Sequence, residues 1–321
     1  EAEIAPIISY LGSAHRLDEI RTYYNGYRFS PRGQQTVYNS DMILYYGLRY
    51  APANDYIESM IDTNVVSDYT KIRAILSIGD QQLEEDILTQ IVEQQSLRVN
   101  QLTKLFILTR ETEFLFDAKA LLSLLFYRGY LTITNSTAEG IELQMPNLVL
   151  KSLYWEYMQY ILMKRSAVRI DGLKKDEMLR DLLHGQLDLL LEFTERLLHG
   201  LSNRDYERFD EKYIKVVMLS LLSDVNLYIP HSEYEVNAGG YVDLYLQAVV
   251  APERSAHYFL ELKYVKASDP DSLVNQKEQA GIEAMQRYLR SASAQRTPNL
   301  HAYVLVFQKD RCVRRRKCEE N

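Results

Sequence analysis

Two short segments near the end of the chain alternate between apolar and polar residues and are rich in aromatic and branched side chains. They cover residues 239–246 (GGYVDLYL) and 258–265 (YFLELKYV), with a short polar stretch between them. This period of two predicts two β-strands that pair as a hairpin or near-hairpin. Because every second side chain of a strand points to the same face of its sheet, the period also predicts which functional groups lie together.

Three charged residues fall within these segments. Glu261 and Lys263 share one face of the second strand, about 6–7 Å apart along it. Pairing of the two strands can bring Asp243 beside Glu261, and two adjacent carboxylates repel each other unless a divalent cation lies between them. A lysine next to such a cation is an arrangement suited to phosphodiester hydrolysis.

The simplest alternative is an ordinary surface ion pair. An acid-x-Lys triplet is expected roughly once or more by chance in a chain this charged, and two others occur at residues 117–119 and 210–212, both with helical spacing. The Glu261 triplet differs because apolar and aromatic residues surround it, which predicts a central strand. Charges in a central strand are costly unless they are paired or bind a metal, so a functional site is favoured.

With their neighbours, these segments resemble the PD-(D/E)XK nuclease superfamily. The positions that carry the resemblance are, in chain order, a helical acid at Glu211, an acid before the first strand at Glu233 or Glu235, Gly-x-x-Asp at 240–243, hydrophobic-Glu-Leu-Lys at 260–263, a helix at 276–289 and a strand at 302–307. The resemblance implies a restriction-endonuclease-like α/β domain with a central mixed sheet. It also implies a metal-dependent nuclease that acts on nucleic acid, with DNA as the first candidate.

The resemblance implies a role for each site residue. Mg²⁺ or Mn²⁺ would be held by Asp243, Glu261 and the backbone carbonyl of Leu262, polarising the phosphate and lowering the pKa of a bound water. Lys263 would position that water or neutralise the charge that develops on the phosphate. Glu211 would complete the acidic cluster, and the two acids before the first strand are lower-ranking candidates.

Two departures from the family pattern favour a second hypothesis. Family members often carry Gly-Arg-x-Asp, whereas this chain has Tyr241 in place of the arginine. The helix that follows often presents Gln one turn before Tyr, whereas here Ala284 stands one turn before Tyr288. Either change can reduce or abolish catalysis, so the alternative is a catalytically degenerate nuclease fold that serves as a binding or regulatory module.

The upstream part is similar to a bacterial family that joins an AAA-ATPase-like domain to such a module. The similar motifs are 23–29 (YYNGYRF) with 37–39 (VYN), and 128–133 (RGYLTI) with 145–147 (MPN). No Gly is followed by Lys, so the phosphate-binding loop is missing and these residues are not expected to hydrolyse ATP. The opening Glu1 without Met fits a fragment or a processed product, with the nucleotide-binding lobe expected upstream.

The middle of the chain predicts a winged-helix-like region followed by a helical connector. Helical spacing at 118–126 precedes two strands, at 129–134 and 141–145, that flank a polar turn. Such helices often read DNA, but this one carries mainly leucine, so a protein contact is favoured. The expected multidomain, helix-rich α/β organisation is an ATPase-like tail at 1–75, the winged-helix-like region at 76–150, the connector at 151–204 and the nuclease-like domain at 205–321.

A leucine stripe at residues 182–198 of the connector requires a partner surface. This surface is either another part of the same chain or, in a homodimer, the connector of a second copy. The chain has 25 tyrosines, and a tyrosine cluster is expected to pack in the core rather than to form a base-stacking platform.

Composition bounds the remaining possibilities. The net charge of −7 argues against non-specific coating of nucleic acid, and the basic run at 311–317 is expected to be a solvated tail rather than a phosphate-binding strip. No run is long enough to span a membrane and no signal peptide opens the chain. The six histidines lack zinc-ligand spacing and only two cysteines are present, so a reducing cytoplasm is the expected location.

Overall fold

The computed structural model describes residues 3–54, 57, 59–61, 65–78, 81–94, 96–103, 117–201, 210–223, 226–237 and 240–319. It divides into two compact units, Glu1–Tyr157 and Met158–Asn321, and the division falls inside helix α7 (Leu148–Ser166). The domain boundaries expected at residues 75, 150 and 204 stay predictions.

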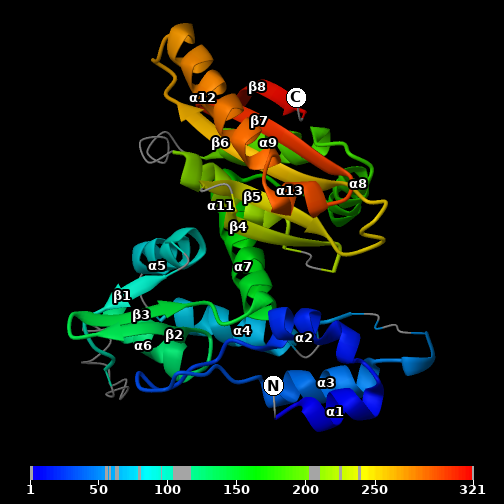
Figure 1. Ribbon diagram of the computed structural model, residues 1–321. Helices are drawn as coiled ribbons and strands as arrows, with labels where there is room; N and C mark the ends of the chain where they lie inside the picture. Colours follow the sequence, from blue (N-terminus) through cyan, green and yellow to red (C-terminus); the bar gives the residue numbers. More distant parts are fainter. Residues whose placement is uncertain are drawn as a thin grey trace. The chain divides into compact units, whose positions relative to one another are not determined.

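Unit 1 combines helices with a three-stranded antiparallel sheet in the order β1-β3-β2 (Figure 1). Asn39 and Asp117 cap α3 and α6, because their side-chain oxygens accept hydrogen bonds from first-turn N–H groups. The predicted wing strands are present as β2 and β3, whereas β1 was not predicted, and the winged-helix assignment stays a prediction. The elements are α1 (Ala5–Leu11), η1 (Ala14–Arg16), α2 (Leu17–Tyr24), α3 (Ser40–Arg49), η2 (Pro52–Asn54), α4 (Val65–Leu76), α5 (Gln81–Gln94), β1 (Leu97–Val99), α6 (Ala118–Tyr127), β2 (Thr132–Thr137) and β3 (Gly140–Gln144).

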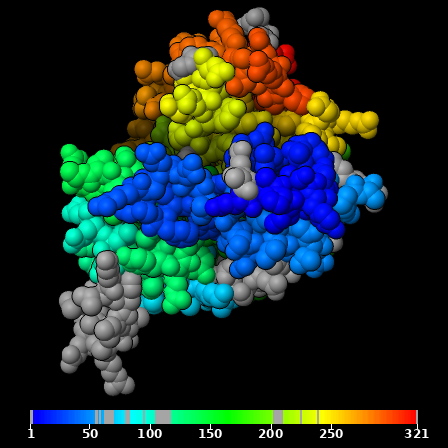
Figure 2. All heavy atoms as spheres, turned by 60° about the horizontal axis from the view of Figure 1, so that its bottom comes forward, coloured from blue at the N-terminus to red at the C-terminus, as the bar shows by residue number. Residues whose placement is uncertain are grey.

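The upstream motifs pack against one another in unit 1. The Arg28 N–H donates to Thr132 Oγ1 at 2.7 Å, and the Ile133 N–H donates to the Arg28 carbonyl at 3.2 Å. Figure 2 shows this blue segment lying against the green surface of the β2–β3 region. Gly26 has φ 120°, and a Cβ there would lie 1.8 Å from the Pro146 carbonyl oxygen, so only glycine fits this close approach.

Most of the tyrosines near the start of the chain are core residues, as expected. Tyr23, Tyr24 and Tyr46 are completely buried. The Tyr24 hydroxyl donates to the Met60 carbonyl at 2.8 Å, which satisfies its polar group inside the core.

Unit 2 is built on a five-stranded mixed sheet in the order β4-β5-β6-β7-β8. Only the β6–β7 pair is parallel. Helix α12 covers one face of the sheet and α11 and α9 lie against the other (Figure 1). The elements after α7 are α8 (Gly172–Leu183), α9 (Asp188–Gly200), α11 (Glu211–Leu221), β4 (Tyr228–Val236), β5 (Gly240–Ala248), β6 (His257–Val265), α12 (Asp271–Leu289), α13 (Ala292–Arg296), β7 (Leu300–Gln308) and β8 (Arg311–Cys318).

Strand β6 is the central strand that its apolar sequence predicts. It pairs with β5 on one side and β7 on the other, and its first six residues are all buried. The parallel β6–β7 pair requires a crossover, which α12 and α13 provide. Gly281 lets α12 approach the sheet closely, since a Cβ there would lie 2.5 Å from Val304.

The basic run near the C-terminus is the edge strand β8, so the expectation of a tail is wrong, although most of its side chains are exposed to solvent as expected. Pairing with β7 holds its backbone, and acids of two helices meet its side chains. Arg315 lies 2.7 Å from Asp188 of α9, while Arg314 and Arg316 lie 3.7 and 3.4 Å from Glu278 of α12. The run therefore serves the packing of the sheet edge, with its positive charge partly neutralised.

The leucine stripe of the connector is used mainly within the chain. Its buried members are Leu182, Leu187, Leu190, Leu191, Leu197 and Leu198. Helices α8, α9 and α11 pack together and α9 packs on β8, which supports the intramolecular alternative and leaves homodimerisation a prediction. Among the described residues, no helix combines the length and apolar character needed to cross a membrane.

Candidate active site

The two sequence-predicted carboxylates lie where β5 and β6 separate. The paired positions of these strands run from Leu246–Tyr258 to Leu244–Leu260, and Asp243 and Glu261 are the next residues on each strand. There the Asp243 carboxylate replaces a backbone partner, accepting a hydrogen bond from the Leu262 N–H at 2.7 Å. The separation of the strands thus opens a polar position beside an otherwise apolar sheet.

Glu261 is the most buried acid of this group. Its residue is 5% exposed, and its Oε1 lies 2.7 Å from the Lys263 ammonium. In the described part of the chain, no group hydrogen-bonds to its other oxygen, Oε2. A buried, unpartnered carboxylate oxygen is costly, so this atom is open to a ligand that can pair with it.

Lys263 contacts two of the three atoms that were expected to hold the metal. Its ammonium donates to Glu261 Oε1 and, at 3.1 Å, to the Leu262 carbonyl. The lysine therefore supplies positive charge at the position expected for a cation, and a bound cation would have to displace it from at least one of these oxygens.

Burial is the largest cause that shifts the pKa values of both acids upward. Burial, followed by the charge of Asp243, raises the pKa of Glu261 to about 7. Burial also raises the pKa of Asp243, against the opposing effects of the Leu262 N–H and Lys263. Burial acts to lower the pKa of Lys263, but the charges of the surrounding acids raise it overall, so its ammonium keeps its charge.

Sequence reasoning missed one contributor, Lys215 of α11. Its side chain is buried at 3% exposure and pairs with Glu233 Oε1, and its charge opposes the rise in the pKa of Asp243. Glu233 stands opposite Asp243 in the β4–β5 register and has a positive φ of 51°, which interrupts the regular pairing there. The only indication in the sequence that Lys215 contributes to the site is its place as a single charged residue within the apolar part of α11.

A comparison with models of known protein families agrees with the order of the helices and strands around Asp243 and Glu261. Residues 209–317 match the family model described as PD-(D/E)XK nuclease superfamily. The match extends from just before α11 into β8 and so includes all of the five-stranded sheet except the last residue, Cys318. The comparisons with curated proteins and with solved structures give no match.

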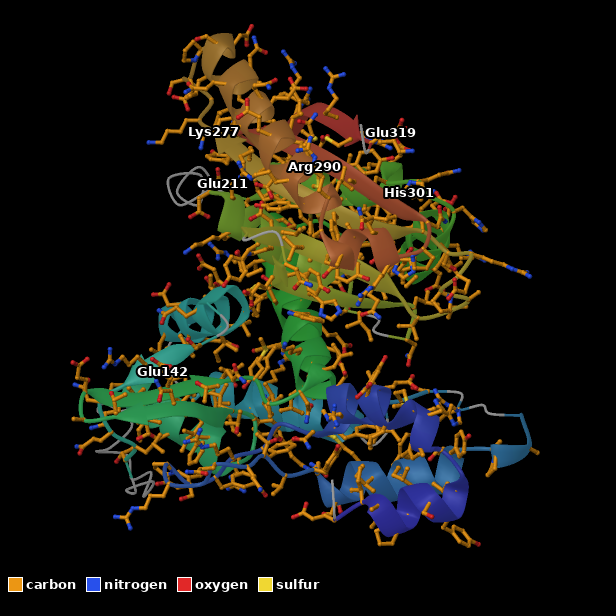
Figure 3. All side chains as sticks on the ribbon, in the orientation of Figure 1. Glu142, Glu211, Lys277, Arg290, His301 and Glu319 are labelled. Carbon is orange, nitrogen blue, oxygen red and sulfur yellow. The ribbon has the colours of Figure 1, made fainter. Side chains whose placement is uncertain are left out.

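Within the matched region, Glu211 lies apart from the carboxylate pair. It is the first residue of α11, and its Oε1 accepts a hydrogen bond from the Tyr264 N–H at 3.2 Å. The Lys277 ammonium of α12 is 3.4 Å away, and Figure 3 shows these two side chains near one another. Its charge is the smallest of the causes that raise the pKa of Lys263.

The two positions that depart from the family pattern have different surroundings. Tyr241 is 54% exposed, whereas Ala284 lies on α12 and is buried in the core between this helix and the sheet. One turn after Ala284, burial and the charges of Glu261 and Asp243 raise the pKa of Tyr288, so its phenol lies close to the carboxylate pair.

The residues present fit a divalent cation of the Mg²⁺ type. Among the described residues, no three His, Cys, Asp or Glu side chains group around one point, so an all-protein cage is absent there. Mg²⁺ is commonly bound by one or two carboxylates together with waters and substrate phosphates. Asp243, the unpartnered oxygen of Glu261 and the Leu262 carbonyl supply that smaller set.

Gly240 is expected to be essential for the packing of Tyr288 beside the site. A Cβ at position 240 would lie 2.6 Å from the Tyr288 ring, so Gly240→Ala must displace the ring. We expect urea unfolding to show a loss of about 1–3 kcal/mol, the usual cost of overpacking. Gly172→Ala is the control, because its Cβ would meet nothing within 4 Å; equal stabilities of the two variants would contradict the packing role.

Proposed function

We propose that the nuclease-superfamily domain hydrolyses phosphodiester bonds in nucleic acid with the help of a divalent cation. One observation carries the proposal: the buried Glu261 has an oxygen to which no described group hydrogen-bonds, beside Asp243 and beside a lysine on its own strand. A purely structural ion pair would be expected to use both oxygens of so deeply buried an acid.

The side chains divide the work as follows. The Leu262 N–H holds Asp243 in orientation. Glu261 would help to hold the cation once it has lost its proton. A bound Mg²⁺ or Mn²⁺ would supply Lewis-acid polarisation of the phosphate and a more acidic water. Lys263, released from Glu261, would donate to a phosphate oxygen or to the attacking water, where its charge stabilises the transition state.

The proposed reaction balances with water as the only co-reactant. The oxygen of water forms a bond to phosphorus while the bond from phosphorus to the leaving oxygen breaks. The attacking water loses one proton to solvent, and the leaving oxygen takes one up. The products are an alcohol and a phosphate monoester.

From the resemblance of the upstream motifs, we also propose that this domain acts on DNA. The domain would belong to a bacterial protein in which it is coupled to an ATPase-like module. The support is the set of shared upstream motifs, which the structure packs together in unit 1 around Gly26 and Arg28.

A catalytically degenerate binding or regulatory module is the second candidate. Two observations favour it. Tyr241 places an exposed phenol where family members often have a cation, and the Lys263 ammonium already contacts two proposed metal ligands.

Metal binding is the first test. Titration calorimetry with Mn²⁺ should give one site in the wild-type chain, and Asp243→Asn should weaken it. Loss of a direct ligand is expected to exceed the roughly 10- to 100-fold cost of losing a group that only orients a ligand. Glu253→Gln, an exposed acid between β5 and β6, is the control and should bind as wild type does. Equal Mn²⁺ affinities in wild type and Asp243→Asn would overturn the site.

A further inference from the structure

The upstream motifs that the nuclease proposal leaves unused enclose a pocket in unit 1. Its volume is about 530 Å³, within the roughly 300–1,000 Å³ usual for small-molecule sites. Tyr27 and Phe29 of the first motif line it together with Arg128, Gly129 and Tyr130 of the second. Residues about a hundred positions apart in the sequence therefore form one site.

Aromatic rings line much of this pocket. The rings of Tyr27 and Phe29 are stacked, with centroids 5.7 Å apart and planes inclined by 21°. Phe29 is 57% exposed and Tyr127 is 46% exposed, although both are large and apolar. A stacked pair with one exposed ring is a platform on which a further flat ring can stack.

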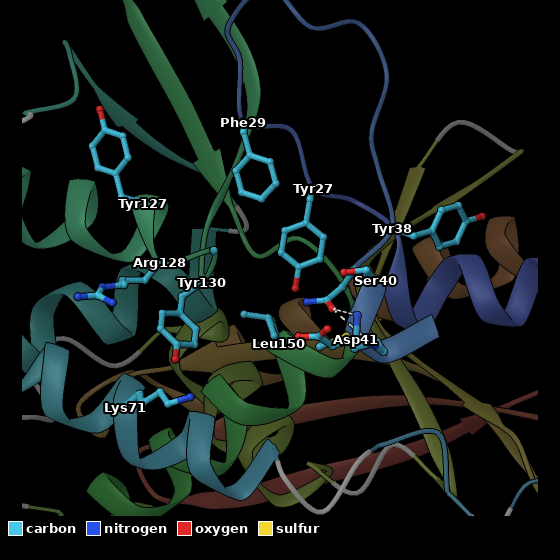
Figure 4. A pocket seen from close by; sticks show the side chains of 13 residues that line it. Tyr27, Phe29, Tyr38, Ser40, Asp41, Lys71, Tyr127, Arg128, Tyr130 and Leu150 are labelled. Carbon is cyan, nitrogen blue, oxygen red and sulfur yellow. Dashed lines mark hydrogen bonds between the residues drawn. The ribbon is translucent and has the colours of Figure 1, made fainter. Parts of the chain in front are cut away.

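The charged side chains that line the pocket are Lys71, Arg128 and Asp41, which gives a net positive charge. In Figure 4, Arg128 and Lys71 lie on one side, with Tyr127 and Tyr130, and Asp41 lies on the other. The basic side suits a phosphate group. The acidic side suits a hydroxyl or amino donor and would repel a phosphate.

The backbone that carries these side chains is well fixed. The Arg28 guanidinium donates to the carbonyls of Thr134 and Pro31 at 2.8 and 2.9 Å, which ties the first motif to β2. Gly129, with φ 77°, ends α6 and turns the chain so that Arg128 and Tyr130 both line the pocket. A preformed site of this kind costs little conformational entropy when a ligand binds.

We propose that this pocket binds a nucleoside phosphate, with the base stacked on Phe29 and Tyr127 and the phosphate held by Arg128 and Lys71. A flat ring joined to an anion is the chemistry that matches stacked aromatic side chains beside two cations. The nucleoside phosphate comes either from a free mononucleotide or from single-stranded nucleic acid. The site lies in unit 1 and does not depend on the chemistry at Asp243.

The test measures binding to the full chain in EDTA, with Asp243→Asn as background so that the nuclease-superfamily domain neither binds metal nor cleaves the probe. One arm titrates AMP, GMP, CMP and UMP by calorimetry, and the other titrates fluorescent single-stranded oligonucleotides by anisotropy. We expect Phe29→Ala and Tyr127→Ala each to weaken binding about tenfold or more. Arg128→Gln should weaken it and reduce its salt dependence.

Matched controls are available in the same unit. Tyr10→Ala removes a ring that is 89% exposed outside the pocket, and Arg98→Gln removes an exposed cation on β1. Both should bind as the background does. Binding of mononucleotides alone or of oligonucleotides alone supports the proposal and identifies the source of the ligand. Absence of binding in both arms, or equal affinities in the pocket and control variants, overturns it.

Discussion

Lys263→Ala is expected to reduce the rate of phosphodiester cleavage by about 10²-fold or more, the usual scale for losing one charge-stabilising group at a reacting phosphate. Binding of Mn²⁺ should survive, because the substitution frees Glu261 Oε1 and the Leu262 carbonyl from the ammonium that contacts them. The measurement is single-turnover cleavage of single-stranded, duplex and structured DNA and RNA with Mg²⁺ and with Mn²⁺.

Lys266→Ala is the matched control for this experiment. Lys266 directly follows β6 and is exposed, so its removal takes a charge from the same region without touching the carboxylates. Its cleavage rate should equal that of wild type. If wild type and Lys263→Ala both cleave nothing under all conditions, the nuclease proposal falls and the binding module becomes the better account. Equal and measurable rates would place the chemistry elsewhere.

The second large effect is a pH dependence of stability that bound metal should reduce or reverse. The folded state raises the pKa of Glu261 from its ordinary 4.5 to about 7, so it keeps this proton to a higher pH than the unfolded state does. Without metal, the free energy of unfolding should therefore fall as the pH rises through this window, by about 3 kcal/mol. With saturating Mg²⁺, which binds the ionised acid, the fall should shrink or reverse.

Glu261→Gln isolates this contribution, because glutamine resembles the protonated acid at every pH. In EDTA, the variant should match wild type near pH 5 and exceed it by up to about 3 kcal/mol near pH 8. Urea unfolding at both pH values measures the difference. Glu235→Gln, an exposed acid on β4, should leave the pH dependence unchanged. A Glu261→Gln variant that is less stable than wild type at pH 8 without metal would show that the carboxylate is a structural ion-pair partner instead.

The local pattern of the sequence was sufficient for the strands and for the face that each charged residue occupies. A period of two depends only on the extended backbone, so it placed Glu261 and Lys263 on one face and predicted β5 and β6 as neighbours. Apolar residues around Glu261 likewise predicted a central strand. These features require no knowledge of what packs on the sheet.

The local pattern of the sequence does not predict contacts between segments that are distant along the chain. Lys215 meets Glu233 only because α11 packs on the sheet and because Glu233 has a positive φ, which alternation does not show. The basic run at 311–317 has the composition of a solvated tail, and only its pairing with β7 makes it a strand. The composition of this segment is compatible with exposure to solvent, but pairing with a neighbouring strand decides whether it forms a β-strand.

The sequence by itself thus determined the strand positions of Asp243, Glu261 and Lys263, the residues that we propose for the chemistry, since side-chain direction follows from the strand period. Only the tertiary structure decided that β5 and β6 separate at these residues, that one oxygen of Glu261 is buried without a partner, and that burial raises its pKa. It also decided that the two upstream motifs line one pocket. The physical reason is that desolvation and pairing are set by what surrounds a group in space, and those surroundings come from segments far away in the chain.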